Sequence, residues 1–279
     1  MTLVEAAILG TVQALTEFLP VSSSGHLRLG AAWLNVDGGH DLLFDIVLHL
    51  GTLGAVLGIY RARIVSLVAD LASNLGAMRQ GLRGWLEASE GARMLALTVI
   101  ATLPTGLIGV ALSDPLEGDA VGTRVVGALL VLNGAVLWYS KRFGEDREVP
   151  ERPLSIGGIG PREAFLIGIA QGVAVLPGIS RAGMTIVCAL ALGARRLKAA
   201  EFSFLLSIPA ILGASVLSFD AAAIRASDAA AATYALGALV SALVGVAALL
   251  FLLRLLRDAH FHRFALYCWL LGAAAIAIG

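Results

Sequence analysis

Glu17-Phe-Leu-Pro-Val-Ser-Ser-Ser-Gly-His26 interrupts the first apolar stretch of this chain. Its ten residues include a carboxylate, a proline, three hydroxyls, a glycine and an imidazole. Polar side chains at membrane depth are costly and indicate a functional site. Irregular backbone survives there only where protein or a water-filled cavity satisfies its N–H and C=O groups. The stretch therefore predicts a broken, re-entrant helix that carries a site.

The composition around this stretch is that of an integral membrane protein. The 279 residues are 58% hydrophobic and 14% charged, with a mean hydropathy of +0.86, whereas a soluble domain has about 25% charged residues. No alternating pattern typical of a transmembrane β-barrel is present. The formal net charge is zero, so charge gives no indication of a nucleic-acid partner. The sequence predicts an all-α, polytopic membrane protein.

Six apolar segments are long enough to cross a bilayer, which requires about 20 residues. We expect spans at about 42–60, 94–112, 123–140, 200–219, 231–253 and 264–278. Residues 61–93 form a separate, amphipathic segment with five arginines. Residues 2–19 and 24–36 are too short to span and predict a hairpin that returns to the same side.

The opening pattern recurs in the second half of the chain. There an apolar segment is broken at Pro177-Gly-Ile-Ser-Arg-Ala-Gly-Met-Thr185. At an offset of 158 or 157 residues, four positions repeat: Gly10 and Gly168, Gln13 and Gln171, Pro20 and Pro177, Ser23 and Ser180. We predict one membrane domain over 1–279, with repeats at about 1–142 and 160–279. Each repeat has a hairpin and three crossings, an odd number, so the second repeat is inverted and the site lies between the halves.

The distribution of basic residues predicts the orientation. Loops at 61–93, 141–162, 195–198 and 254–263 hold sixteen of the twenty Lys and Arg residues. The positive-inside rule places these loops in the cytoplasm. Both termini are then extracytoplasmic.

The two breaks have the chemistry of an anion site. Half-helix N-termini offer free N–H groups and a positive dipole end. A buried arginine, Arg181, matches phosphate oxygens with its planar fork; the alternative is an ion pair with Glu17 across the repeat interface, and the two are compatible. We predict Arg181 as catalytic and assign substrate binding to Ser22, Ser24, Gly178, Ser180 and Thr185.

Glu17 lies one helical turn beyond Gln13, so both face the same way. Their oxygens suit a hard divalent cation, Mg²⁺ or Ca²⁺, although a lone glutamate neutralised by burial is the alternative. Ser23 and His26 are three residues apart, which allows the imidazole to serve the hydroxyl as base, or a leaving phosphate as acid. The predicted catalytic residues are thus Glu17, Ser23, His26 and Arg181.

At these motifs the sequence resembles the undecaprenyl-diphosphate phosphatase family, also called the bacitracin-resistance family. The two breaks, with Phe44-Asp-Ile-Val-Leu-His-Leu-Gly-Thr52 and Glu201-Phe-Ser-Phe-Leu-Leu206, carry the resemblance. It implies a divalent-metal-dependent enzyme of the bacterial inner membrane that recycles the lipid carrier of peptidoglycan synthesis. Gln13 stands where some members have Glu, which weakens a two-carboxylate metal site. Ala182 replaces a serine that is common in the second motif, so that hydroxyl is not essential here.

The resemblance implies hydrolysis of undecaprenyl diphosphate in a site that opens outward, with Ser23 or an activated water as nucleophile. The rival hypothesis is a polyprenyl-phosphate transporter that uses the same anion site, because inverted repeats and re-entrant hairpins are typical of transporters. The glycine-rich spans also permit a homodimer.

Overall fold

The computed structural model describes residues 1–34, 42–116, 121–143, 154–217 and 231–279. These residues are helical, apart from turns and one isolated bridge between Ile156 and Ile159. The elements in chain order are α1 (Leu3–Phe18), α2 (Ser23–Leu34), α3 (Leu42–Ser73), η1 (Leu75–Gln80), α4 (Gly81–Ala88), α5 (Glu90–Leu116), α6 (Thr123–Tyr139), η3 (Ser140–Phe143), α7 (Pro161–Val173), α8 (Arg181–Ala191), α9 (Arg196–Leu217), α11 (Ala231–Arg257), η4 (Phe261–Arg263) and α12 (Phe264–Ile278).

Six helices of the described residues are long and apolar enough to cross a membrane, as predicted. They are α3, α5, α6, α9, α11 and α12 with their short 3₁₀ extensions. The four helices beside the breaks, α1, α2, α7 and α8, have only 16, 12, 13 and 11 residues. At about 1.5 Å per residue they measure about 17 to 24 Å, less than the ~30 Å hydrocarbon core of a bilayer.

The predicted end of the first span was wrong. Instead of ending near Tyr60, α3 continues to Ser73. The intervening residues contain no proline or glycine, so nothing in the backbone stops the helix. At the far end of α3, Asp70 accepts hydrogen bonds from the Ser89 hydroxyl (2.6 Å) and the Gly91 N–H (2.8 Å). These bonds join α3 to the beginning of α5, which starts at Glu90 rather than near 94.

Helices of the first half of the chain pack against helices of the second half. Helix α1 packs along α11, α7 along α5, and α6 along α12. Both repeated glycines lie at such crossings: a Cβ on Gly10 would lie 2.7 Å from the Gly237 carbonyl oxygen, and one on Gly168 would overlap the Ala101 carbonyl. The two glycines that recur in the sequence therefore make similar close contacts.

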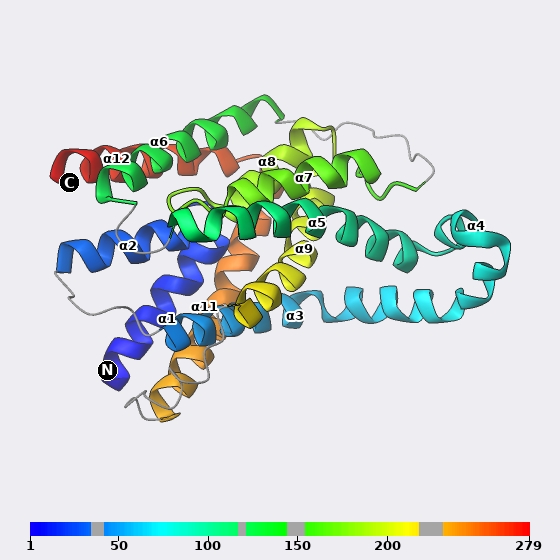
Figure 1. Cartoon of the computed structure of the whole chain (residues 1–279), viewed down its shortest axis with the longest axis horizontal. Coiled ribbons are helices and arrows are strands. Elements are labelled where there is room, and N and C mark those ends of the chain that lie inside the picture. Colours follow the sequence, from blue (N-terminus) through cyan, green and yellow to red (C-terminus); the bar gives the residue numbers. More distant parts are fainter. Residues whose placement is uncertain (35–41, 117–120, 144–153, 218–230) are drawn as a thin grey trace.

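Figure 1 shows both termini toward one end of the long axis and α4 at the opposite end. The largest buried apolar cluster of the described residues includes Phe18 of α1, Ile186 of α8, Phe202 and Leu206 of α9, and Leu249 of α11. The Phe18 and Phe204 rings meet at 5.9 Å between centroids. The breaks that follow α1 and α7 are thus enclosed by helices of both halves.

Candidate active site

The first break begins where Pro20 ends α1. Leu19, the C-cap of α1, is extended, the conformation favoured before a proline. Ser22 has φ +70°, a left-handed conformation that is rare for a residue with a Cβ. The chain turns sharply there and α2 begins at Ser23. Glu17, on the last turn of α1, thereby faces the first residue of the next helix.

The second break is built from glycine and a capping serine. Gly178 has φ +107°, a region that residues with side chains rarely adopt. Ser180 is the N-cap of α8, and its hydroxyl accepts the Gly183 N–H at 3.1 Å. This cap points the N-terminus of α8 at the first break and places Arg181 at its first position.

Ser22 joins the two breaks. Its hydroxyl oxygen accepts the N–H groups of Gly25 at 3.3 Å and Gly178 at 3.0 Å. A Cβ on Gly25 would lie 3.1 Å from the Gly178 Cα, so the two loops are in backbone contact. We predicted Ser22 as a substrate ligand, but the structure uses its buried hydroxyl as a bridge between the halves.

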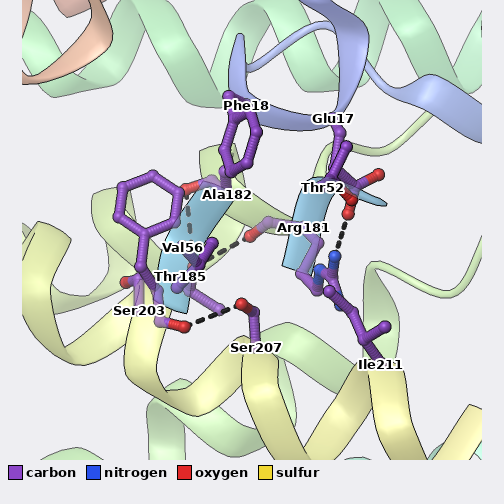
Figure 2. A pocket seen from close by; sticks show the side chains of 11 residues that line it. Glu17, Phe18, Thr52, Val56, Arg181, Ala182, Thr185, Ser203, Ser207 and Ile211 are labelled. Atoms are coloured by element: carbon purple, nitrogen blue, oxygen red, sulfur yellow. Dashed lines mark hydrogen bonds and ion pairs between the residues drawn. The ribbon is translucent and has the colours of Figure 1, made fainter. Parts of the chain in front are cut away.

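Glu17 lies at the centre of the site. Its side chain is 6% exposed and forms an ion pair with Arg181. The Ser23 hydroxyl donates to Glu17 Oε2 at 2.8 Å and the Gln13 amide donates to the same oxygen at 3.2 Å. The ion pair across the two halves, which the sequence indicated as the alternative role of Arg181, is therefore present (Figure 2). A buried carboxylate requires such partners, because an uncompensated charge is costly away from water.

The structure pairs Ser23 with Glu17 rather than with His26. The His26 Nδ1 lies 2.8 Å from the Ser22 carbonyl oxygen and Nε2 lies 2.7 Å from the Tyr267 hydroxyl. A carbonyl oxygen only accepts, so Nδ1 carries the proton and Nε2 of the neutral ring accepts from Tyr267. The first turn of α2 places the two side chains near one another but directs them to different partners.

His49 is a site residue that the sequence did not reveal. It lies on α3, and its Nε2 is 3.7 Å from Glu17 Oε2. Its Nδ1 lies 2.8 Å from the Asp45 carbonyl oxygen, which directs Nε2 toward the carboxylate. The spacing of a histidine within a helix does not show what it faces, so the sequence alone leaves His49 open between a helix-packing residue and a group that supports the site.

A small pocket of about 10 Å³ lies beside the ion pair (Figure 2). The Thr185 hydroxyl, which lines it, donates to the Arg181 carbonyl at 2.9 Å. The Ser203 hydroxyl is buried there without a hydrogen-bond partner. The predicted ligand Ser24 lies outside this pocket and is exposed, with its hydroxyl 3.4 Å from that of Ser22. The lining residues are Glu17, Phe18, Thr52, Val56, Arg181, Ala182, Thr185, Ser203, Phe204, Ser207 and Ile211.

The Glu17 carboxylate and the Gln13 amide oxygen are the kind of metal ligands that a hard cation prefers, with phosphate oxygens as its remaining ligands. Gln13 is fully buried, and its Oε1 has no hydrogen-bond partner. The described residues contain no cluster of three His, Cys, Asp or Glu side chains that could form a protein-only cage. Mg²⁺ is commonly bound through one or two carboxylates together with substrate phosphates. A carboxylate and an unpaired amide oxygen match that type of site.

Comparison with known proteins gives the family of the chain. Residues 6–274 match the family model described as bacitracin resistance protein BacA. Proteins named undecaprenyl-diphosphatase are similar over nearly the whole chain. The one from Methanosphaera stadtmanae is 36% identical over 100% of this chain and 98% of its own. Those from Desulforapulum autotrophicum and Desulfatibacillum aliphaticivorans are 38% and 40% identical, over 100% and 98% of this chain and 99% and 97% of theirs. The chain belongs to the BacA family of bacitracin resistance proteins.

Proposed function

We propose that this protein hydrolyses undecaprenyl diphosphate to undecaprenyl phosphate and inorganic phosphate. The observation that carries this proposal is the meeting of two helix breaks at the Glu17–Arg181 pair. The relatives' name gives the substrate. None of those names supports transport of a polyprenyl phosphate, the rival hypothesis.

The positive groups at the breaks would hold the diphosphate. Arg181 has five N–H donors, one of which contacts Glu17. The N-termini of α2 and α8, which begin at Ser23 and Arg181, add first-turn N–H groups and the positive ends of two helix dipoles. Phosphoryl transfer requires mainly such positioning and charge stabilisation.

The reaction breaks the bond between the terminal phosphorus and the bridging oxygen, and undecaprenyl phosphate leaves. If Ser23 attacks, its Oγ forms the new bond to phosphorus and its proton passes to Glu17 Oε2, which it already contacts at 2.8 Å. Water then hydrolyses the phosphoserine. If water attacks, inorganic phosphate forms directly. A role of His26 in proton transfer requires its Nε2 to exchange Tyr267 for a phosphate oxygen or water.

Glu17 and Gln13 would hold a divalent cation, with Gln13 Oε1 as the unpaired donor. Such a cation neutralises charge on the phosphate oxygens. The observation that supports this cation is that Glu17 and Gln13 offer oxygen atoms as ligands, which Mg²⁺ and Ca²⁺ prefer.

We further propose that α1–α2 and α7–α8 are re-entrant hairpins of two inverted repeats. Their short helices and the matching crossings of α1 on α11 and α7 on α5 support this arrangement. The basic loops support an inner-membrane orientation with both termini extracytoplasmic and the site opening outward. The repeat boundaries and the homodimer stay predictions.

The function is tested by phosphate release from undecaprenyl diphosphate by purified protein in detergent. We expect release with Mg²⁺ or Ca²⁺ and at least a tenfold loss with excess EDTA, because the phosphate charge is then less well neutralised. Undecaprenyl phosphate is the control substrate and should release no phosphate. Detergent removes the two-sided membrane that transport requires, so an absence of release from folded protein would contradict the enzyme and favour a carrier. Equal release with EDTA would contradict the metal.

Ser23→Ala separates the two nucleophiles. On the covalent route we expect turnover to be lost while undecaprenyl diphosphate still binds, since Arg181 and the helix N-termini remain. Phosphate release and equilibrium binding measure these two effects. Ser66→Ala is the matched control, because this exposed α3 serine bonds only within its helix. Residual activity above about one hundredth of the parent rate would exclude Ser23 as nucleophile, since water would then attack.

A further inference from the structure

Asn133 makes a second bridge between the two breaks. It lies on α6 and is fully buried. Its Nδ2 donates to the Pro20 carbonyl at 2.9 Å, and its Oδ1 accepts the Ser180 N–H at 3.0 Å. One amide thus bonds the first break and the second. A backbone N–H only donates and a carbonyl only accepts, so these partners fix the orientation of the amide.

The surroundings of Asn133 are apolar. Leu130 and Leu137, one turn on either side, are also fully buried, and Leu130 packs with Leu29 of α2. A buried amide is costly unless it is hydrogen-bonded, and Asn133 makes a third contact, from Nδ2 to the Cys268 sulfur at 3.4 Å. An aliphatic residue would fill this position more simply, so the polar contacts themselves account for the asparagine.

The partners of Asn133 are the backbone groups that place the reacting side chains. Pro20 lies three residues from both Glu17 and Ser23, and Ser180 directly precedes Arg181. The Glu17–Arg181 pair also links the halves, but a bound diphosphate competes for the Arg181 charge. A link made by neutral groups does not respond to that competition. Ser22 and Asn133 provide neutral links of this kind between the two breaks.

We propose that Asn133 is a positioning residue of the phosphatase, which sets the distance between the Glu17–Ser23 side and the Arg181 side of the site. This proposal rests on the proposed function. The hydrogen bonds of Asn133 reach the backbone of Pro20 and Ser180, so it acts through these two residues. A displacement of about 1 Å in a reacting group costs about 100-fold in rate, whereas ground-state attraction of an anion to Arg181 depends less on exact placement.

The test compares Asn133→Ala, which removes both bonds, with Asn133→Asp, which keeps the acceptor for Ser180 and, as a buried protonated carboxyl, an O–H donor for the Pro20 carbonyl. We expect kcat to fall about 100-fold or more in Asn133→Ala and by a smaller factor in Asn133→Asp. In both, KM should change by less than about threefold, since Arg181 and the helix N-termini remain.

Ser241→Ala is the matched control. Ser241 is also fully buried and also bonds between helices, from α11 to the Leu48 carbonyl at 2.9 Å. It should lower the Tm as the Asn133 variants do and leave kcat within about twofold of the parent, because it bonds neither break. Folded Asn133 variants that keep the parent kcat would overturn the proposal. An inactive parent protein would instead contradict the phosphatase itself.

Hydrogen exchange in the parent decides the matter if neither Asn133 variant folds. The Asn133 bond should protect the Ser180 amide as strongly as the internal amides of α8, although Ser180 precedes that helix. Exchange at the rate of an open loop would show that the bridge is not maintained and would overturn the proposal.

Discussion

Replacement of Glu17 by glutamine is expected to lower phosphate release by at least about 1,000-fold. Glu17 is the common partner of Arg181, Ser23 and Gln13, and in our proposal it accepts the Ser23 proton and holds the cation. Glutamine preserves the shape and one acceptor oxygen but neither the charge nor the basicity. Phosphate release by purified protein, with the divalent ion titrated, measures the effect.

Glu5→Gln is the matched control for Glu17→Gln. Glu5 lies on the same helix, at its N-terminus, where its carboxylate accepts the Thr2 N–H at 2.9 Å. Its replacement should cost about 1 kcal/mol or less of stability and leave kcat unchanged. Retention of a tenth of the activity by Glu17→Gln would place the base and the cation on other residues.

Replacement of Arg181 by alanine is expected to lower kcat/KM about 1,000-fold or more. Loss of one oriented donor costs about 100- to 1,000-fold in enzymes that stabilise an oxyanion, and Arg181 presents several. Arg181→Lys should recover little of this activity, because a point charge does not reproduce the planar fork. Steady-state kinetics with undecaprenyl diphosphate check both variants. Arg254→Gln, an exposed substitution at the end of α11, is the control and should retain the parent kinetics.

Stability and activity should separate in the double variant Glu17→Gln with Arg181→Gln. Removing one partner of a buried ion pair leaves an uncompensated charge, which costs about 3–5 kcal/mol, whereas replacing both is often neutral. We therefore expect each single variant to lower the Tm, the double variant to recover most of that loss, and none of the three to be active. Recovery of activity in the double variant would show that the pair is structural only.

Much of the fold follows from the sequence because the bilayer restricts what the chain can do. Apolar stretches of about 20 residues must be helices, since backbone groups in lipid have no water to bond. This restriction on the backbone accounts for the six spans and for the two breaks, where proline and glycine interrupt apolar sequence. It does not determine helix ends outside the lipid, so α3 continues to Ser73 without any hydropathy signal to indicate it.

The sequence by itself indicated that Glu17 and Arg181 could form an ion pair, which the structure contains. A buried charge needs a partner, and each break supplies one charge, of opposite sign. Only the tertiary structure decided which polar groups the remaining residues meet. Ser22 bridges to Gly178, Ser23 bonds Glu17 rather than His26, and His49 faces the carboxylate. Asn133 bonds groups 113 residues before it and 47 residues after it along the chain. Hydrogen bonds depend on direction and on a few tenths of an ångström, and helical spacing shows which face a residue is on but not what lies opposite.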